Sequence, residues 1–89
     1  MMKVVKREVE IVEVEGLASL LGERVLLMCA NYFYEGILTG VNNTCVLLED
    51  VGIVYETGPW SETGFKDRQQ LPHPRYVQNT FIESYGLSE

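Results

Sequence analysis

The sequence contains too few metal-ligating side chains to predict a metal centre. It has one histidine, His73, which lies between two prolines, and two cysteines, Cys29 and Cys45, that do not form a Cys-x-x-Cys pair. Zinc sites need several nitrogen or sulfur ligands at characteristic spacings. We therefore expect no metal and no cofactor. Both cysteines lie in apolar runs, and we interpret them as buried thiols that act as small hydrophobic side chains.

Long apolar runs and a signal peptide are also lacking. No apolar stretch approaches the roughly 20 residues that a membrane-spanning helix needs. The first ten residues, MMKVVKREVE, carry too many charges for a secretory signal. The sequence therefore predicts a protein that stays in the cytoplasm and has no membrane partner.

Positive charge is scarce. Seven basic residues stand against 13 acidic ones, which gives a formal net charge of −6. Proteins that bind nucleic acid without sequence preference usually have the opposite balance, because the neutralisation of phosphates drives their affinity. Six of the seven bases form two small clusters that we interpret in the first place as solvated side chains: Lys3, Lys6 and Arg7, and Lys66, Arg68 and Arg75.

Residue sets typical of catalysis are absent from the sequence. It contains no Ser/His/Asp or Cys/His combination and no glycine-rich phosphate loop. The neighbouring acids Glu49 and Asp50 are better interpreted as the solvated end of a strand. We therefore expect that the protein is not an enzyme.

The length of the chain sets a limit on its core. Its 89 residues suffice for one domain and leave no room for a second core. A chain of this size buries only about 60 to 65% of its unfolded surface, so it is marginally stable alone. Small domains are usually reinforced by a metal, disulfides or oligomerisation. Because the sequence supports neither of the first two, we expect an oligomer.

Three apolar, β-prone runs make up the centre of the chain: 24–30, 32–41 and 44–57. A turn at 29–31 and the pair Asn42-Asn43 separate them, and strands joined by such short turns pair in antiparallel fashion. Gly36 and Gly40 lie inside the second run, where glycine marks a bend, a bulge or a close backbone approach. The pattern predicts a bent antiparallel sheet or a small barrel.

The flanking segments are less regular. Residues 1–15 alternate in part between Glu and Val, which favours an extra strand over a helix, and a mobile arm is the other interpretation. Leucines at helical spacing between Gly16 and Gly22 predict a short helical turn that ends at glycine. We expect residues 16–89 to form the single domain, with a last strand at 75–84.

Residues 58–74 contain all three prolines and predict a long loop, and loops of this length in compact domains are often functional or mobile. Trp60 and Phe65 are its aromatic residues. They have three interpretations: anchoring of the loop to the core, contact with a neighbouring subunit, or stacking on a ligand.

Two groups of residues form a pattern that is known from one family. They are Leu17, Leu20, Leu21, Gly22, Arg24 and Val25, and then Tyr34, Gly36, Leu38, Asn42, Leu48, Glu49 and Asp50. The first group resembles the short N-terminal helix and the entry into the first strand of the Sm-like family. The second resembles that family's first motif of an aromatic, a glycine, a leucine, an acid and later a leucine followed by acids. The likeness covers roughly residues 17–55, with a weaker tail at 76–87.

The resemblance implies a mainly β fold, namely a small, strongly bent, five-stranded antiparallel barrel of the Sm-like and SH3-like barrel class with a short N-terminal helical turn. It also implies a homo-oligomeric ring, which we expect to hold about five to eight subunits, because the edge strands of neighbouring subunits pair in this family. Such pairing would enlarge the marginal core and cover exposed sheet edges.

The resemblance further implies RNA binding near a central pore. The loop residues that correspond to the family's site are Asn42, Asn43 and Thr44. The family's Ile-Arg-Gly motif matches Ile82-Glu83-Ser84, where Glu83 replaces the arginine and reverses its charge, so that this position cannot offer a guanidinium to a phosphate.

The leading hypothesis is therefore a ring-forming Sm-like protein that binds RNA or single-stranded DNA through a surface that differs from the family's pocket. Ser84 and the stacking side chain of Tyr85 would contribute to it, and Lys3, Lys6 and Arg7 would form a basic rim. The alternative is an assembly or adaptor module without nucleic acid, in which Trp60 and Phe65 form a protein-interaction loop.

Overall fold

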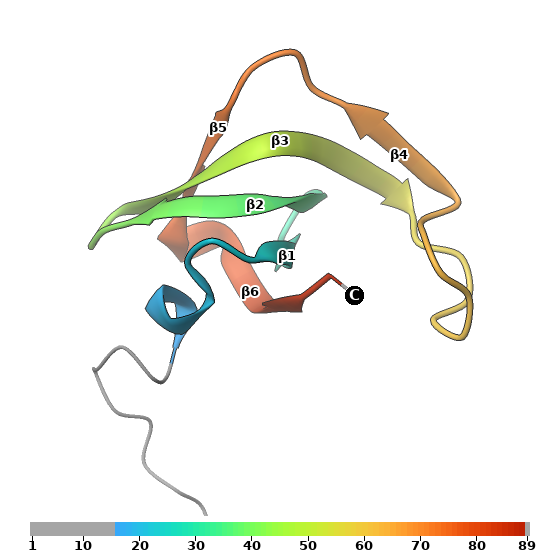
Figure 1. Cartoon of the computed structure of the whole chain (residues 1–89), viewed down its shortest axis with the longest axis horizontal. Helices are drawn as coiled ribbons and strands as arrows, with labels where there is room; N and C mark the ends of the chain where they lie inside the picture. The colour runs from blue at the N-terminus through green and yellow to red at the C-terminus, as the bar shows by residue number, and fades with distance from the viewer. Residues whose placement is uncertain (1–15, 89) are drawn as a thin grey trace, which may run out of the picture.

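The computed structural model describes residues 16–88, so the predictions for residues 1–15, including the basic rim of Lys3, Lys6 and Arg7, lie outside the described residues. The described chain contains six strands and two short 3-10 helices, η1 and η2 (Figure 1). In chain order these are η1 (Leu17–Leu20), β1 (Arg24–Cys29), β2 (Phe33–Val41), β3 (Cys45–Glu56), β4 (Asp67–Gln70), β5 (Arg75–Gln78), η2 (Asn79–Phe81) and β6 (Ile82–Leu87).

The strands form one antiparallel sheet in the order β4-β3-β2-β1-β6, and β5 also pairs with β3. This confirms the prediction of a mainly β, antiparallel fold with a helical turn before the first strand. The predicted number of five strands is wrong for the described chain, which has six. Within residues 16–88, the strand pairings leave β6 at one end of the strand order and β4 at the other, so they do not close the sheet into a barrel.

Two prolines lie in the segment that separates β4 from β5. β4 and β5 both run along the same edge of β3, and the segment between them arches away from it (Figure 1). Pro72 and Pro74 lie in this segment, and proline has no amide hydrogen to donate to a ladder. The predicted loop 58–74 is therefore too long, because it includes β4. The predicted last strand 75–84 is also interrupted, because η2 separates β5 from β6.

A bulge between β2 and β3 provides a bend in the sheet. Between the paired positions Glu35↔Gly52 and Ile37↔Glu49, one residue of β2 faces two residues of β3, so the register shifts there. A Cβ atom on Gly36 would lie 2.9 Å from the carbonyl oxygen of Glu49. This confirms that glycine inside this strand permits a close backbone approach. Glu49 and Asp50 are exposed, as predicted, but the predicted strand end is wrong, because both residues lie in the middle of β3.

Side chains of β1, β2 and β3 form the centre of the hydrophobic core. Its largest fully buried side chains are Val25, Leu27, Leu38, Val46, Leu48 and Val51. Leu17 and Leu20 of η1 pack against this core, and Gly22, at φ 88°, lets the chain turn into β1. Neither of the helices in the described residues is long and apolar enough to cross a membrane.

Candidate functional site

Aromatic side chains line a hollow of about 300 Å³ beside the start of β2 and along β5 and η2. We call it the tyrosine groove. Tyr76 is 71% exposed, Phe81 is 51% exposed and Tyr32 is 47% exposed, whereas Tyr34 is half-buried and packs against the core. Large aromatic rings are normally buried or partnered, so three exposed rings around one hollow are a candidate binding surface.

The elements that carry these rings determine where the rings lie. In β5, Val77 is buried in the core, and its neighbour Tyr76 is therefore directed to the other face. Phe81 ends η2, directly after β5. The carbonyl of Phe81 accepts a hydrogen bond of 3.0 Å from the amide of Ala30, which ties η2 to the β1–β2 turn beside Tyr32. The groove is thus built on elements that the sheet holds in place.

Arg75 also lines the groove, and it differs from the other lysines and arginines within residues 16–88, which are engaged in ion pairs. Lys66 pairs with Glu56, and Arg24 and Arg68 pair with Glu35. Arg75 makes no ion pair with another residue within 16–88. Arg75 therefore adds a positive charge to the aromatic lining of the tyrosine groove.

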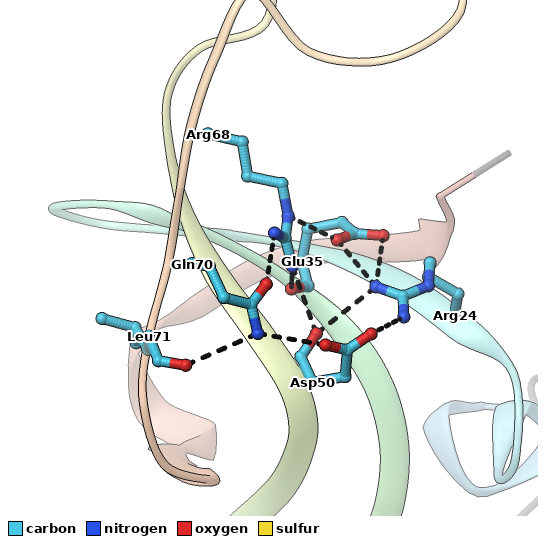
Figure 2. Close-up of polar contacts among 6 residues, drawn as sticks. All are labelled: Arg24, Glu35, Asp50, Arg68, Gln70 and Leu71. Atoms are coloured by element: carbon cyan, nitrogen blue, oxygen red, sulfur yellow. Dashed lines mark hydrogen bonds and ion pairs between the residues drawn. The ribbon is translucent and has the colours of Figure 1, made fainter.

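A buried carboxylate lies at the bend of the sheet. Glu35 is only 3% exposed, and two guanidinium groups hold its side chain (Figure 2). Nη1 of Arg24 is 3.1 Å and Nε of Arg68 is 2.8 Å from Oε1 of Glu35. Charge pairing with additional hydrogen bonds is what permits a carboxylate to be buried.

Asp50 extends this network across the bulge. Its side chain pairs with Arg24 and accepts a hydrogen bond of 3.0 Å from the side-chain amide of Gln70 (Figure 2). The hydrogen bond from Arg24 is the main cause that lowers the pKa of the Asp50 carboxyl, and the positive charge of Arg24 adds to it. Within residues 16–88, Asp50 is the one non-glycine residue with positive φ, at 49°. We call Arg24, Glu35, Asp50, Arg68 and Gln70 the bulge network, and we assign it a structural role because its charges are mutually satisfied.

Gly52 makes room for this network. A Cβ atom at Gly52 would lie 2.6 Å from Cζ of Arg68, so the guanidinium group lies directly over the glycine. The interpretation of Arg68 as a solvated base is therefore wrong. Its side chain is 22% exposed, and it bridges β4 to the carbonyl oxygens of Glu35 and Asp50 at 3.2 and 3.1 Å.

The predicted loop residues form the turn between β2 and β3. The side-chain oxygen of Asn42 accepts hydrogen bonds of 2.8 Å from the amide of Thr44 and 2.9 Å from that of Cys45. The predicted turn is confirmed, but Asn42 stabilises it by hydrogen bonding and not through positive φ. Asn43 is exposed in the same turn.

Asn79 contacts this turn, and the sequence does not predict this contact. Its side-chain amide donates a 3.0 Å hydrogen bond to the carbonyl of Asn42, and its backbone amide donates a 2.9 Å bond to that of Thr44. The side-chain oxygen of Asn79 is buried without a hydrogen-bond partner among the described residues. A single asparagine in a sequence carries no signal that would predict the contact of Asn79 with a turn so far away in the chain.

Ser84 and Tyr85 lie on β6, opposite Met28 and Leu27 of β1, and no hydrogen bond within residues 16–88 joins them to the turn.

The loop between β3 and β4 holds the two predicted aromatic contacts. Trp60 is 65% exposed and Phe65 is half-buried, and both line a hollow of about 260 Å³ that also includes Ser88. Anchoring to the core therefore does not account for Trp60. The two interpretations that remain for it are contact with a neighbouring subunit and stacking on a ligand.

The cysteines and acids do not suggest a cofactor site. Burial raises the pKa of the Cys29 thiol, and the negative charge of Glu83 adds to the effect. Cys29 is buried and Cys45 half-buried, and both are free thiols. Between residues 16 and 88, no group of three or more His, Cys, Asp or Glu residues is arranged to hold a metal ion.

The comparisons with known proteins do not assign the chain to a family. No protein-family model matches it, and no match was found among the curated proteins or the solved structures. The candidate site therefore stands on its own geometry.

Proposed function

We propose that this chain is a non-catalytic protein-binding module and that the tyrosine groove is its binding surface. The observation that carries the proposal is the group of exposed rings of Tyr32, Tyr76 and Phe81 around one hollow, with Arg75 beside them. Aromatic residues and arginine are enriched in the centres of protein interfaces, where they provide much of the binding energy. Trp60 provides a second exposed aromatic contact on the β3–β4 loop.

Charge favours a protein partner over a nucleic acid. The chain has a net charge of −6, and the bulge network occupies Arg24 and Arg68 with carboxylates. Surfaces that bind single strands combine stacking rings with a positively charged groove that follows the phosphates. The tyrosine groove has the rings but only one arginine, Arg75.

Selection from a random peptide library tests the proposal. The wild-type protein serves as bait, and a Tyr32→Ala/Tyr76→Ala variant serves for counter-selection. We expect enriched peptides that bind the wild type and lose at least about tenfold in affinity on the variant, as expected for interface hot spots. Tyr85→Ala is the matched control, because Tyr85 is a similarly exposed tyrosine that does not line the groove. Peptides that bind all three proteins equally, or no enrichment at all, would contradict the proposal.

A nucleic-acid-binding ring of the Sm-like kind is the second candidate, and the sheet edges favour it. Within residues 16–88, β6 pairs with β1 alone, and β5 pairs with β3 alone. Arg75 on β5 and Glu83 on β6 have opposite charges. Pairing of β5 with β6 of a neighbour would therefore match charges and cover two free edges.

Solution mass and oligonucleotide binding test this second candidate. Light scattering behind a sizing column should give a mass of about five to eight copies if the edges close a ring. Binding of single-stranded RNA or DNA should be strongest at low salt and should weaken when Asn42 and Asn43 are both replaced by alanine. A monomer, or no binding at low salt, would exclude the nucleic-acid-binding ring and leave the protein-binding module as the proposal.

A further inference from the structure

A second hollow shares two lining residues with the tyrosine groove. This hollow has a volume of about 450 Å³ and also borders the end of β3. Tyr32 and Asn31 line both hollows, so one ligand can contact both of them. The rings of Tyr32 and Tyr55 meet edge to face with centroids 6.0 Å apart, which fixes the position of the shared ring. Tyr32 therefore joins the lining of the tyrosine groove to that of the second hollow.

The two hollows differ in charge. Arg75 lines the first and Glu56 lines the second. The ion pair between Glu56 and Lys66 is 3.4 Å long and more than half exposed on both sides, so it is weak and open to competition. An extended ligand with a negative group at one end and no phosphates along its length complements this arrangement.

Polar side chains line the two hollows together with the rings. Asn31 borders both hollows and Gln78 borders the first, and each side-chain amide can donate hydrogen bonds. A polyproline II segment has no internal hydrogen bonds, so its carbonyl groups are free to accept such donors, and its pyrrolidine rings pack on aromatic side chains. Because that helix is already ordered before binding, less conformational entropy is lost on its capture.

We infer that the occupant of the tyrosine groove is an extended, proline-rich peptide with a carboxylate side chain placed against Arg75. The inference rests on the proposed protein-binding function and specifies its ligand. Prolines would pack on the rings of Tyr32, Tyr76 and Phe81, and the side-chain amides would hold the backbone carbonyls. Glu56 at the far end would disfavour a second acid there and would disfavour the continuous negative charge of a nucleic acid.

Titration calorimetry with defined peptides tests this inference. The probes are three capped decaproline peptides with a glutamate, a lysine or a glutamine as one additional residue, each prepared with that residue at either end. We expect the full-length protein to bind at least one glutamate peptide about two- to fivefold more tightly than its lysine counterpart at low salt, the size of effect that an exposed ion pair provides. Raising the salt concentration should reduce the difference.

Two variants identify the residues responsible. Arg75→Glu should reverse the preference, so that a lysine peptide binds more tightly than its glutamate counterpart. Tyr76→Ala should weaken all the peptides about tenfold or more, whereas Tyr85→Ala should leave them unchanged. Near-ultraviolet circular dichroism of each variant confirms that the fold is retained.

The outcomes separate this inference from the proposed function. If library selection yields peptides that depend on Tyr76 but none of the decaproline peptides binds, the module stands and the proline-rich ligand is refuted. A glutamate preference that persists in Arg75→Glu also refutes the inference. If single-stranded oligonucleotides displace a bound peptide at physiological salt, the groove is a nucleic-acid surface and both proposals fail.

Discussion

Replacement of Arg68 by methionine tests whether the bulge network stabilises the bent sheet. Methionine keeps most of the length of the side chain but has no donors, so the change removes hydrogen bonds without leaving a large cavity. The variant loses the 2.8 Å bond to the Glu35 carboxylate and the bonds to the carbonyl groups of Glu35 and Asp50. It also loses the 2.7 Å bond to the side-chain oxygen of Gln70. Arg24 still pairs with Glu35, so the buried carboxylate keeps one of its two cations.

The expected cost follows from these contacts. Hydrogen bonds of a charged group contribute about 1.5–3 kcal/mol each. The charged guanidinium of Arg68 makes all of the lost bonds, but its removal also removes the cost of its burial. The Arg68 side chain is 22% exposed, so water replaces part of what is lost. We therefore expect a loss of roughly 3 kcal/mol in the free energy of unfolding, out of a total of about 5–15 kcal/mol for a typical domain. This corresponds to a fall in Tm of about 12–24 °C for a domain of this size.

Thermal and urea unfolding followed by circular dichroism measure this loss. Arg75→Met is the matched control, because Arg75 is an exposed arginine and makes no ion pair within residues 16–88. Its stability should change by less than about 0.5 kcal/mol. Arg68→Lys should recover part of the loss, since it restores the charge but not the planar fork. If Arg68→Met is no less stable than Arg75→Met, the stabilising role of the network is refuted.

Three further predictions concern neighbouring features. The hydrogen bond with Arg24 lowers the pKa of Asp50 below its ordinary value of 3.8, so its stabilising effect is present above that value and is lost as pH falls through the lower folded-state pKa. The Tm of the wild type should therefore fall more steeply below about pH 4 than that of Asp50→Asn, and parallel acid limbs would contradict this. Gly36→Ala should cost about 1–3 kcal/mol in urea unfolding, because its Cβ would lie 2.9 Å from the backbone oxygen of Glu49, and a neutral result would mean that the bulge can relax. Asn42→Ala should cost about 1 kcal/mol through the lost turn hydrogen bonds, and Asn42→Asp, which keeps the acceptor, should cost less.

Local patterns explain what the sequence could predict. The β2–β3 turn follows from the Asn42-Asn43 pair between two apolar runs, and the bulge was anticipated from Gly36 inside a strand. The turn η1 follows from leucines at helical spacing before Gly22. In each case, neighbouring residues determine the local backbone, so a single sequence is sufficient.

Long-range contacts explain what the sequence could not predict. β4 has the sequence DRQQ, which shows no apolar alternation, and it becomes a strand because Arg68 reaches Glu35 across the sheet. The tyrosine groove combines Tyr32 with Tyr76, which are far apart in the chain and belong to two separate predicted strands, 32–41 and 75–84. Asn79 reaches the β2–β3 turn in the same way. Such pairs are determined by the register of the sheet and have no local signature.

The pairing of β1 with β6, the first and last strands within residues 16–88, has a consequence for folding. β1 (Arg24–Cys29) has β2 on one side and β6 (Ile82–Leu87) on the other, so its second ladder forms only after the chain is available through residue 87. Closing a loop of that length costs conformational entropy before any contact compensates it, and chains dominated by such distant pairings fold slowly. During synthesis on the ribosome, β1 therefore presents an unpaired edge next to the apolar core until its last partner emerges. This interval is when the chain is most exposed to aggregation and most open to help from a chaperone.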